Sequence, residues 1–263
     1  MIPARLGSTR MPQKMLRRET GRYLFEHTVR AVERSSAVER VVVATDAEEI
    51  LSAAEEVGIE ALLTSAAHQS GTDRVHEAWR LIAEREGADF DVVLNVQGDE
   101  PELPPADLDV LVAAFDDPET EIATLCTPIA TREEVLDPAV VKVVRDAAGF
   151  ALYFSRSPVP SLDHPSRPMR PGAPGLQAAL RHVGVYAFRP AALQGFCGLP
   201  YGALEATENL EQLRWLEAGR RMRVLDATRP TYGIDTEEDY AAFVARQDSN
   251  ELIANGTEGS PTR

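Results

Sequence analysis

An acidic residue follows a largely apolar stretch in the middle of the chain. The segment 92–96 is short and rich in β-branched side chains, which predicts a buried strand of a parallel sheet. Gly98 permits a tight exit from this strand, and Pro101 prevents a further ladder hydrogen bond. Asp99 is therefore expected at the carboxyl end of a central strand, where ligands bind in open α/β sheets. A helix cap is a weaker alternative, because the next predicted helix begins only near Pro105.

Positive charge is concentrated at the start of a chain whose net charge is −15. Residues 1–18 contain no acid and five bases, namely Arg5, Arg10, Lys14, Arg17 and Arg18. Gly7, Ser8 and Thr9 stand among them, and small residues let backbone N–H groups approach an anion closely. We interpret residues 3–14 as an anion-binding loop. A solvated basic face is the alternative, and the glycine and prolines of this segment argue against it.

The composition is that of one globular domain. Hydrophobic residues make up 44% and charged residues 26% of 263 residues, enough to bury one large core. The acidic balance argues against nucleic-acid binding. No segment resembles a signal peptide or approaches the ~18–20 apolar residues of a membrane span. Cys126 and Cys197 lack metal-ligand spacing, so buried thiols in a reducing cytoplasm are expected.

The first half of the chain alternates strands and helices. This order predicts an α/β, Rossmann-like fold with a mostly parallel central sheet. The expected strands cover residues 1–2, 38–44, 61–63, 92–96 and 122–129. The expected helices cover residues 24–32 and 47–57, a segment ending near 85 that Thr72 or Asp73 would cap, and residues 105–115. The first strand is unusually short, since only Met1 and Ile2 remain of it.

The second half of the chain begins with a hairpin pattern. Residues 140–145 and 151–156 flank a turn at 146–149. The apolar run Val140–Val144 in a hairpin outside the main sheet predicts a two-fold homodimer. A proline-rich irregular loop at 157–175 and further elements at 183–188, 207–218, 222–225 and 236–246 complete one predicted domain, 1–247. Within it, about 138–188 form a dimerisation subdomain, and the polar segment 248–263 is predicted to be a disordered tail.

Three polar residues in this half each have two interpretations. Asp235 is as suited to capping a helix that begins at Thr236 as to binding a metal. His182 follows the proline-rich loop and is expected to meet an anion, with a structural hydrogen bond as the alternative. Glu211 is either a ligand-binding group or a solvated helix residue paired with Arg214.

Eight stretches of the chain together resemble one enzyme family. They are IPARLGSTRMPQKML, VATD, HQSGTDR, NVQGDEP, VKVVRDAAGFALYFSR, RHVGVYAFR, LEQLRWL and YGIDTEEDY. In this order, over residues 1–243, they resemble the 3-deoxy-manno-octulosonate (Kdo) cytidylyltransferases. The resemblance implies a nucleotidyltransferase fold and an enzyme that converts CTP and Kdo into CMP-Kdo and pyrophosphate with Mg²⁺. It implies a role in the synthesis of lipopolysaccharide or a related glycan.

The resemblance also implies roles for individual residues. The residues implied for the triphosphate are Arg5, Arg10 and Lys14. Those implied for the cytosine and ribose side of CTP are Ser70, Gly71, Thr72 and Arg74. The implied magnesium ligands are Asp99 and Asp235, which with Arg10 and Lys14 form the catalytic set. The residues implied for the sugar acid are Gln97, Arg156, His182, Tyr186, Glu211 and Gln212, which places the sugar beside the 138–188 subdomain.

Two other functions stay open at this point. Sialate cytidylyltransferases share PAR-x-x-S-T-R and an aspartate at a strand end, so the acceptor is either Kdo or another acid, such as a sialic acid or a phosphonate. A catalytically weak nucleotide-binding homologue is the second alternative, suggested by the short first strand. The bases and acids kept at Arg10, Lys14, Asp99 and Asp235 argue against it.

Overall fold

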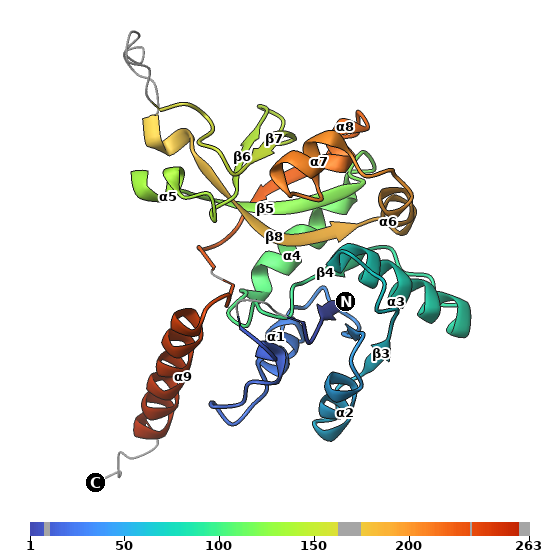
Figure 1. Ribbon diagram of the computed structural model, residues 1–263, viewed down its shortest axis with the longest axis vertical. Coiled ribbons are helices and arrows are strands. Elements are labelled where there is room, and N and C mark those ends of the chain that lie inside the picture. The colour runs from blue at the N-terminus through green and yellow to red at the C-terminus, as the bar shows by residue number, and fades with distance from the viewer. Residues whose placement is uncertain (8–10, 163–174, 232, 258–263) are drawn as a thin grey trace.

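The computed structural model describes residues 1–7, 11–162, 175–231 and 233–257, and the structural statements below concern these ranges. Two sheets lie one above the other in Figure 1, with the N-terminus between them. The lower sheet is parallel, in the order β1-β2-β3. Its strands are β1 (Ile2–Ala4), β2 (Val43–Thr45) and β3 (Ala61–Leu63). The helices α1 (Leu24–Val32) and α2 (Glu48–Glu56) belong to this half, and α1 buries Phe25 and Val29 in the core.

The upper sheet is mixed rather than parallel. It has the order β7-β6-β8-β5-β9, and β4 also pairs with β8. Its strands are β4 (Val93–Asn95), β5 (Ile122–Pro128), β6 (Lys142–Arg145), β7 (Ala151–Ser155), β8 (Leu180–Phe188) and β9 (Arg223–Asp226). The prediction of a mostly parallel sheet therefore holds for β1–β3 and for the β5–β9 pair. It fails elsewhere because β8 runs antiparallel to β4, β5 and β6.

The predicted hairpin is present, but it is not outside the main sheet. β6 and β7 pair antiparallel, and β6 also pairs with β8. The apolar run faces the interior, since Val143 and even Lys142 are fully buried. The Lys142 ammonium group donates to three backbone carbonyls, those of Asp137, Val140 and Arg156, at 2.6–2.9 Å. These bonds compensate the burial of its charge.

Met1 joins the two sheets. Its ammonium group donates to the Leu94 carbonyl at 3.0 Å, and its own carbonyl accepts from Val96 N–H at 3.1 Å. Burial lowers the pKa of this amine to about 5. Beside Met1 is a cavity of about 320 Å³, lined mainly by residues 37–42 and 89–94. Met1 thus ties β1 to β4 through two backbone hydrogen bonds.

The remaining helices cover the sheets. They are α3 (Gly71–Glu86), α4 (Pro105–Ala113), α5 (Arg132–Leu136), α6 (Pro190–Cys197), α7 (Ala203–Glu208), α8 (Leu213–Glu217) and α9 (Glu237–Thr257). Single 3₁₀ turns cover Lys14–Leu16, Ala114–Asp116 and Gly175–Ala178. Among the described residues, no helix combines the length and the apolar character needed to cross a membrane.

Two helix predictions are corrected. The helix expected over 207–218 is split into α7 and α8, because Asn209 adopts a left-handed conformation with φ of 53° that ends α7. The last helix does not stop at 246 but continues to Thr257, so the predicted disordered tail begins too early. Residues 258–263 and most of the proline-rich loop lie outside the described residues. Near its start α9 docks through Tyr240 and Phe243 onto a small apolar cluster with Met11, Leu24 and Ile234.

Candidate active site

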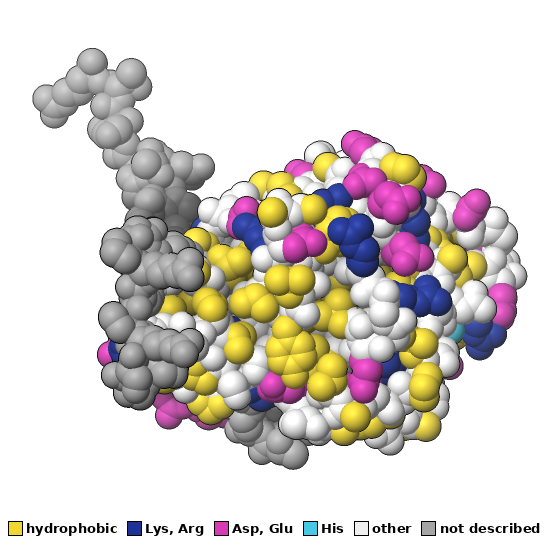
Figure 2. All heavy atoms as spheres, turned by 90° about the horizontal axis from the view of Figure 1, so that it is seen from above, with side chains coloured by type: hydrophobic (Ala, Val, Ile, Leu, Met, Phe, Trp, Pro, Cys, Tyr) yellow, Lys and Arg dark blue, Asp and Glu magenta, His cyan; other side chains and the backbone are white. Residues whose placement is uncertain are grey.

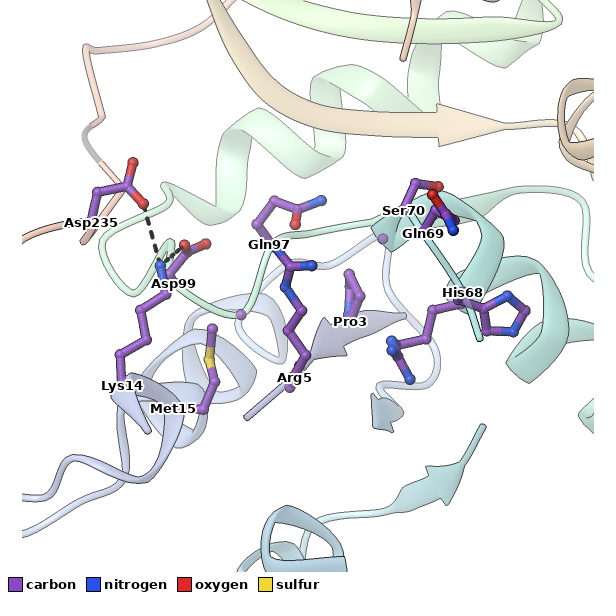
Figure 3. Close-up of a pocket in the computed structure, with 14 residues that line it drawn as sticks. Pro3, Arg5, Lys14, Met15, His68, Gln69, Ser70, Gln97, Asp99 and Asp235 are labelled. Atoms are coloured by element: carbon purple, nitrogen blue, oxygen red, sulfur yellow. Dashed lines mark hydrogen bonds and ion pairs between the residues drawn. The ribbon is translucent and has the colours of Figure 1, made fainter. Parts of the chain in front are cut away.

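A pocket of about 240 Å³ opens where the loops after β1 and β4 meet the start of α3 (Figure 3). It collects residues from five separate segments of the chain. They are Pro3, Ala4, Arg5, Lys14, Met15, His68, Gln69, Ser70, Gly71, Arg74, Gln97, Gly98, Asp99 and Asp235. Four of these belong to the predicted loop 3–14 and three follow the predicted strand 92–96, and the fold brings both segments to one sheet edge, as expected for an α/β protein. Arg10 lies outside the described residues.

Lys14 is at the centre of the charged end of this pocket. Its Nζ lies 2.5 Å from Asp99 Oδ2 and 3.4 Å from Asp235 Oδ1, and it donates to the Ile234 carbonyl at 2.9 Å. Figure 3 shows the two carboxylates converging on this ammonium group. The lysine side chain is 9% exposed, whereas those of Asp99 and Asp235 are 21% and 45% exposed. The cation is therefore shielded from solvent while both acids keep access to the pocket.

The position of Asp235 is set by the backbone before α9. Ile234 N–H donates to the Asp99 carbonyl at 2.9 Å, which ties the two acidic segments together. The helix cap is Thr236, because its Oγ1 accepts from Asp239 N–H and the Asp239 carboxylate accepts from Thr236 N–H. The alternative role of Asp235 as the helix cap is therefore wrong, and its side chain lies at Lys14 instead.

The loop before α3 forms the opposite wall. Ser70, not Thr72 or Asp73, caps α3, since its Oγ accepts from Asp73 N–H at 3.1 Å. A side chain at Gly71 would put a Cβ 3.3 Å from Pro3 and 3.4 Å from Gln97, so glycine keeps this wall close to β1. Arg74 lines the pocket but is held by Asp46, at 2.6 Å. Ser70 and Gly71 thus offer polar backbone and a hydroxyl beside the pocket.

A chain of hydrogen bonds leads out of the pocket into the upper half of the molecule. Gln97 donates to Asn95 at 3.2 Å, Asn95 donates to Thr72 at 3.1 Å, and Thr72 donates to Glu211 at 2.5 Å. Asn95 and Thr72 are fully buried, and Thr72 does not line the pocket. The sequence analysis did not single out Asn95. Its signal is an amide within an otherwise apolar strand.

The turn between α7 and α8 carries Gln212, which is buried, and Glu211, which is half-buried. Burial is the main cause that raises the pKa of Glu211, and its Oε2 has no hydrogen-bond partner among the described residues. Gln212 Nε2 likewise has no hydrogen-bond partner among the described residues. Burial, followed by the charge of Glu211, raises the pKa of Tyr186 well above its ordinary value. The alternative interpretation of Glu211, a solvated helix residue paired with Arg214, is wrong, because Arg214 pairs with Glu205 at 2.6 Å. Unpartnered buried polar atoms of this kind suit a hydroxyl-rich ligand.

His182 lies on β8 near these groups. Burial lowers its pKa to about 3, so the ring is neutral at physiological pH. Its Nε2 is 3.0 Å from Thr124 Oγ1, and its ring packs against Phe154 and Tyr186 with centroids 5.0 and 5.4 Å away. The neutral ring can offer a ligand a hydrogen bond but no positive charge, which differs from the anion-binding role expected of His182 from the sequence.

Arg156 stands apart from the pocket. Its guanidinium donates to the carbonyls of Glu208 at 2.9 Å, Pro138 at 3.1 Å and Asn209 at 3.4 Å. These contacts connect the end of the β6–β7 hairpin to the α7–α8 turn. The six residues implied for the sugar acid therefore fall into three places: Gln97 in the pocket, Tyr186, His182, Glu211 and Gln212 beyond the buried chain, and Arg156 at the hairpin.

Glu100 is a further acid with a buried carboxylate oxygen, and it was not predicted as a site residue. Burial is the largest cause that raises its pKa to about 8, and the charge of Asp99 adds to the effect. Its Oε2 has no partner among the described residues. Its signal in the sequence is a second acid immediately after Asp99 in the same loop.

The donor set fits Mg²⁺ in its common mode of binding. Magnesium is typically held by one or two carboxylates, with substrate phosphates and water completing the octahedron. Asp99 and Asp235 supply two such carboxylates, close enough to share one lysine. No group of three or more possible metal-ligating side chains occurs in the described ranges, so a complete protein cage is not formed by them.

The fold and pocket suit a nucleotidyltransferase, because the mixed α/β frame presents a cation and two carboxylates beside a glycine-containing loop at one sheet edge. Comparison with known proteins then gives the family. The sequence profile described as cytidylyltransferase matches residues 1–222. The chain belongs to this family, in its 3-deoxy-manno-octulosonate branch, as its sequence motifs had indicated.

Named relatives cover nearly the whole chain. A 3-deoxy-manno-octulosonate cytidylyltransferase of Anaeromyxobacter sp. is 47% identical over 240 residues, 91% of this chain and 92% of the relative. The enzyme of that name from Koribacter versatilis is 43% identical over 239 residues, 91% of this chain and 86% of the relative. A solved structure of CMP:2-keto-3-deoxy-manno-octonic acid synthetase complexed with CTP superposes with a TM-score of 0.83 at 35% identity, covering 95% of this chain and 97% of that one.

Proposed function

We propose that the protein transfers CMP from CTP to the anomeric hydroxyl of Kdo, releasing pyrophosphate and forming CMP-Kdo. The observation that carries the proposal is the Lys14–Asp99–Asp235 cluster at the mouth of a pocket with a small-residue wall. Relatives and a solved neighbour named for this reaction support the choice of substrates. The product serves lipopolysaccharide or related glycan synthesis.

The chain's own residues act mainly by positioning and charge. Lys14 and Arg5 face the space where the phosphates of CTP would lie and neutralise charge that builds on the departing pyrophosphate. Ser70 and Gly71 let the nucleotide approach the start of α3. No covalent intermediate with the protein is needed, since the acceptor hydroxyl attacks the α-phosphorus directly and pyrophosphate leaves.

We assign Asp99 and Asp235 as the residues that would hold Mg²⁺. Bound there, the metal would neutralise phosphate charge and lower the pKa of a coordinated hydroxyl. Ile234 donates its N–H to the Asp99 carbonyl and accepts from Lys14. These bonds fix the distance between the two carboxylates at the place where the cation would bind. Arg10 is assigned to the triphosphate on the family resemblance alone.

The acceptor side suits a polyhydroxylated acid. Glu211, Gln212 and Tyr186 present buried groups that donate to or accept from hydroxyls, and a polar site rejects ligands that leave such groups unpaired. A small phosphonate would satisfy few of them. His182 adds a neutral hydrogen-bonding ring to this side.

The test is pyrophosphate release from CTP with a panel of acceptors: Kdo, a sialic acid, a neutral octose and a simple phosphonate. Kdo should react fastest, and the neutral sugar should fail. Faster reaction with the sialic acid or the phosphonate would overturn the acceptor but keep cytidylyl transfer. No CTP turnover with any acid would favour a non-catalytic nucleotide-binding protein.

We also propose a homodimer located in the cytoplasm. The dimer is supported by large apolar side chains exposed around the β6–β7 hairpin and α7, namely Leu152, Tyr201 and Leu204. Figure 2 shows hydrophobic side chains spread over the face that these elements form. The location is supported by two free cysteines, Cys126 and Cys197, which are typical of a reducing compartment.

A further inference from the structure

Lys14 makes bonds to both carboxylates that the proposed function assigns to a metal. The contacts are to Asp99 Oδ2 and Asp235 Oδ1, and the same ammonium group donates to the Ile234 carbonyl. The three acceptors come from two segments far apart in the sequence, after β4 and before α9. The Lys14 ammonium group alone thus bonds to both acidic segments and holds them next to each other.

The same lysine lines the pocket that would receive a triphosphate. An ammonium group is a compact point charge on a flexible four-carbon stem, so it can turn between neighbouring anions. A divalent cation that took Asp99 Oδ2 and Asp235 Oδ1 as ligands would compete with Lys14 Nζ for the space between them. Positive charges at that separation also repel each other strongly in a partly desolvated site.

We propose that Lys14 is an exchangeable internal counter-ion that couples nucleotide binding to metal binding. With its bonds to Asp99 and Asp235 in place, it opposes metal binding at the pair. When a triphosphate enters, Lys14 turns to the phosphates and leaves the two carboxylates to the metal. This inference rests on the proposed function for the position of the metal, and adds that the lysine restrains the metal site until the nucleotide arrives.

Arg5 provides a matched comparison. It lines the same pocket with the same charge, and within the described ranges it forms no ion pair with either carboxylate. Removing Arg5 changes the general electrostatic field of the pocket. Removing Lys14 changes that field and also removes its direct contacts with the two carboxylates. The difference between the two variants isolates the direct contact.

The experiment measures Mn²⁺ binding to the full chain without nucleotide, by electron paramagnetic resonance of the free ion. Lys14→Met should bind Mn²⁺ at least about tenfold more tightly than the parent, and Arg5→Met at most about threefold. Lys14→Gln removes the charge but keeps a hydrogen-bond donor, and it should bind Mn²⁺ about as tightly as Lys14→Met. Mn²⁺ should also raise the melting temperature more in Lys14→Met than in the parent, which verifies that the variant is folded.

Two contrary results have different meanings. Binding by Lys14→Met that is no tighter than by Arg5→Met would overturn the exchange while leaving the metal site in place. Mn²⁺ binding to Lys14→Met that is unchanged by adding Asp99→Asn would overturn the exchange and also the assignment of the metal to this pair. Cytidylyl transfer by the parent chain, measured separately with CTP and Kdo, tests the proposed reaction independently of both.

Discussion

The carboxylate of Asp99 is expected to contribute more to activity than any neutral amide could at the same position. Asp99→Asn keeps the size of the side chain but removes the charge that faces Lys14. Turnover should fall by ~10²–10³-fold, the scale of losing one key electrostatic group. Steady-state pyrophosphate release measures the effect. Asp91→Asn, at an exposed acid before the same strand, is the control and should leave turnover unchanged. Near-normal turnover of Asp99→Asn would refute the site assignment.

The buried ring of His182 makes stability depend on pH. Its pKa is about 3 in the folded protein and about 6.5 when unfolded, so the unfolded state binds the proton first as pH falls. Stability should therefore decrease as pH falls from 6.5 towards 3, by about 1.4 kcal/mol at pH 5.5 for this group. Urea unfolding at pH 7.5 and 5.5 should show that His182→Gln loses less stability than the parent. An equal loss in both proteins would mean that His182 is not buried as a neutral ring.

Single residues were predictable where a local pattern sets their position. Asp99 and Lys14 follow from a strand end and a basic loop, and the structure brings them together. Asn95 and Glu100 were missed, because the burial of a polar side chain depends on segments that pack over it from elsewhere in the chain. The partner of Arg214 was missed for the same reason, since Glu205 reaches it from α7.

At the scale of elements, the buried chain from Gln97 to Glu211 connects β4 and α3 to the α7–α8 turn. Thr72→Val keeps the shape of the side chain but removes the bond to Glu211. The lost bond should lower the free energy of unfolding by ~1–3 kcal/mol. It should also raise the KM for the sugar acid about tenfold, more than the KM for CTP.

Thr72→Ser is the matched control, because it keeps the hydroxyl. The KM of Thr72→Ser for the sugar acid should therefore be much closer to that of the parent than the KM of Thr72→Val is. Steady-state kinetics with each substrate varied in turn makes the comparison. A rise in the KM for CTP alone would instead place Thr72 with the nucleotide, as the family resemblance implies.

Elements were predictable from periodicity, and their breaks and partners were not. The helix over 207–218 has a helical apolar pattern, but Asn209 leaves the helical region and turns Glu211 inward. The direction of β8 is likewise invisible in its apolar sequence, because a fully buried strand looks the same in parallel and antiparallel sheets. Both features matter for the site, since they place the acceptor side at the end of the hydrogen-bond chain that starts at Gln97 in the pocket.

At the scale of the whole molecule, the exposed apolar face of the hairpin is expected to bury itself against a second copy. Leu152 on β7 and Tyr201 before α7 are 63% and 65% exposed. Leu152→Asp should shift the protein to monomers in light scattering at micromolar concentration, because a charge replaces apolar contact area. Leu63→Asp, at an exposed leucine on β3 in the other sheet, is the control and should leave the assembly intact. A monomeric parent protein would contradict the proposed dimer.

The enclosed position of the Met1 amine affects where a purification tag can be attached. This amine lies inside the molecule against Leu94, next to the cavity lined by residues 37–42 and 89–94. An affinity tag fused directly ahead of Met1 would have to pass through this cavity and displace the contacts of the Met1 amine, at a cost in folding yield. Purification handles are therefore best placed after the last residue, on the side of the chain that follows α9.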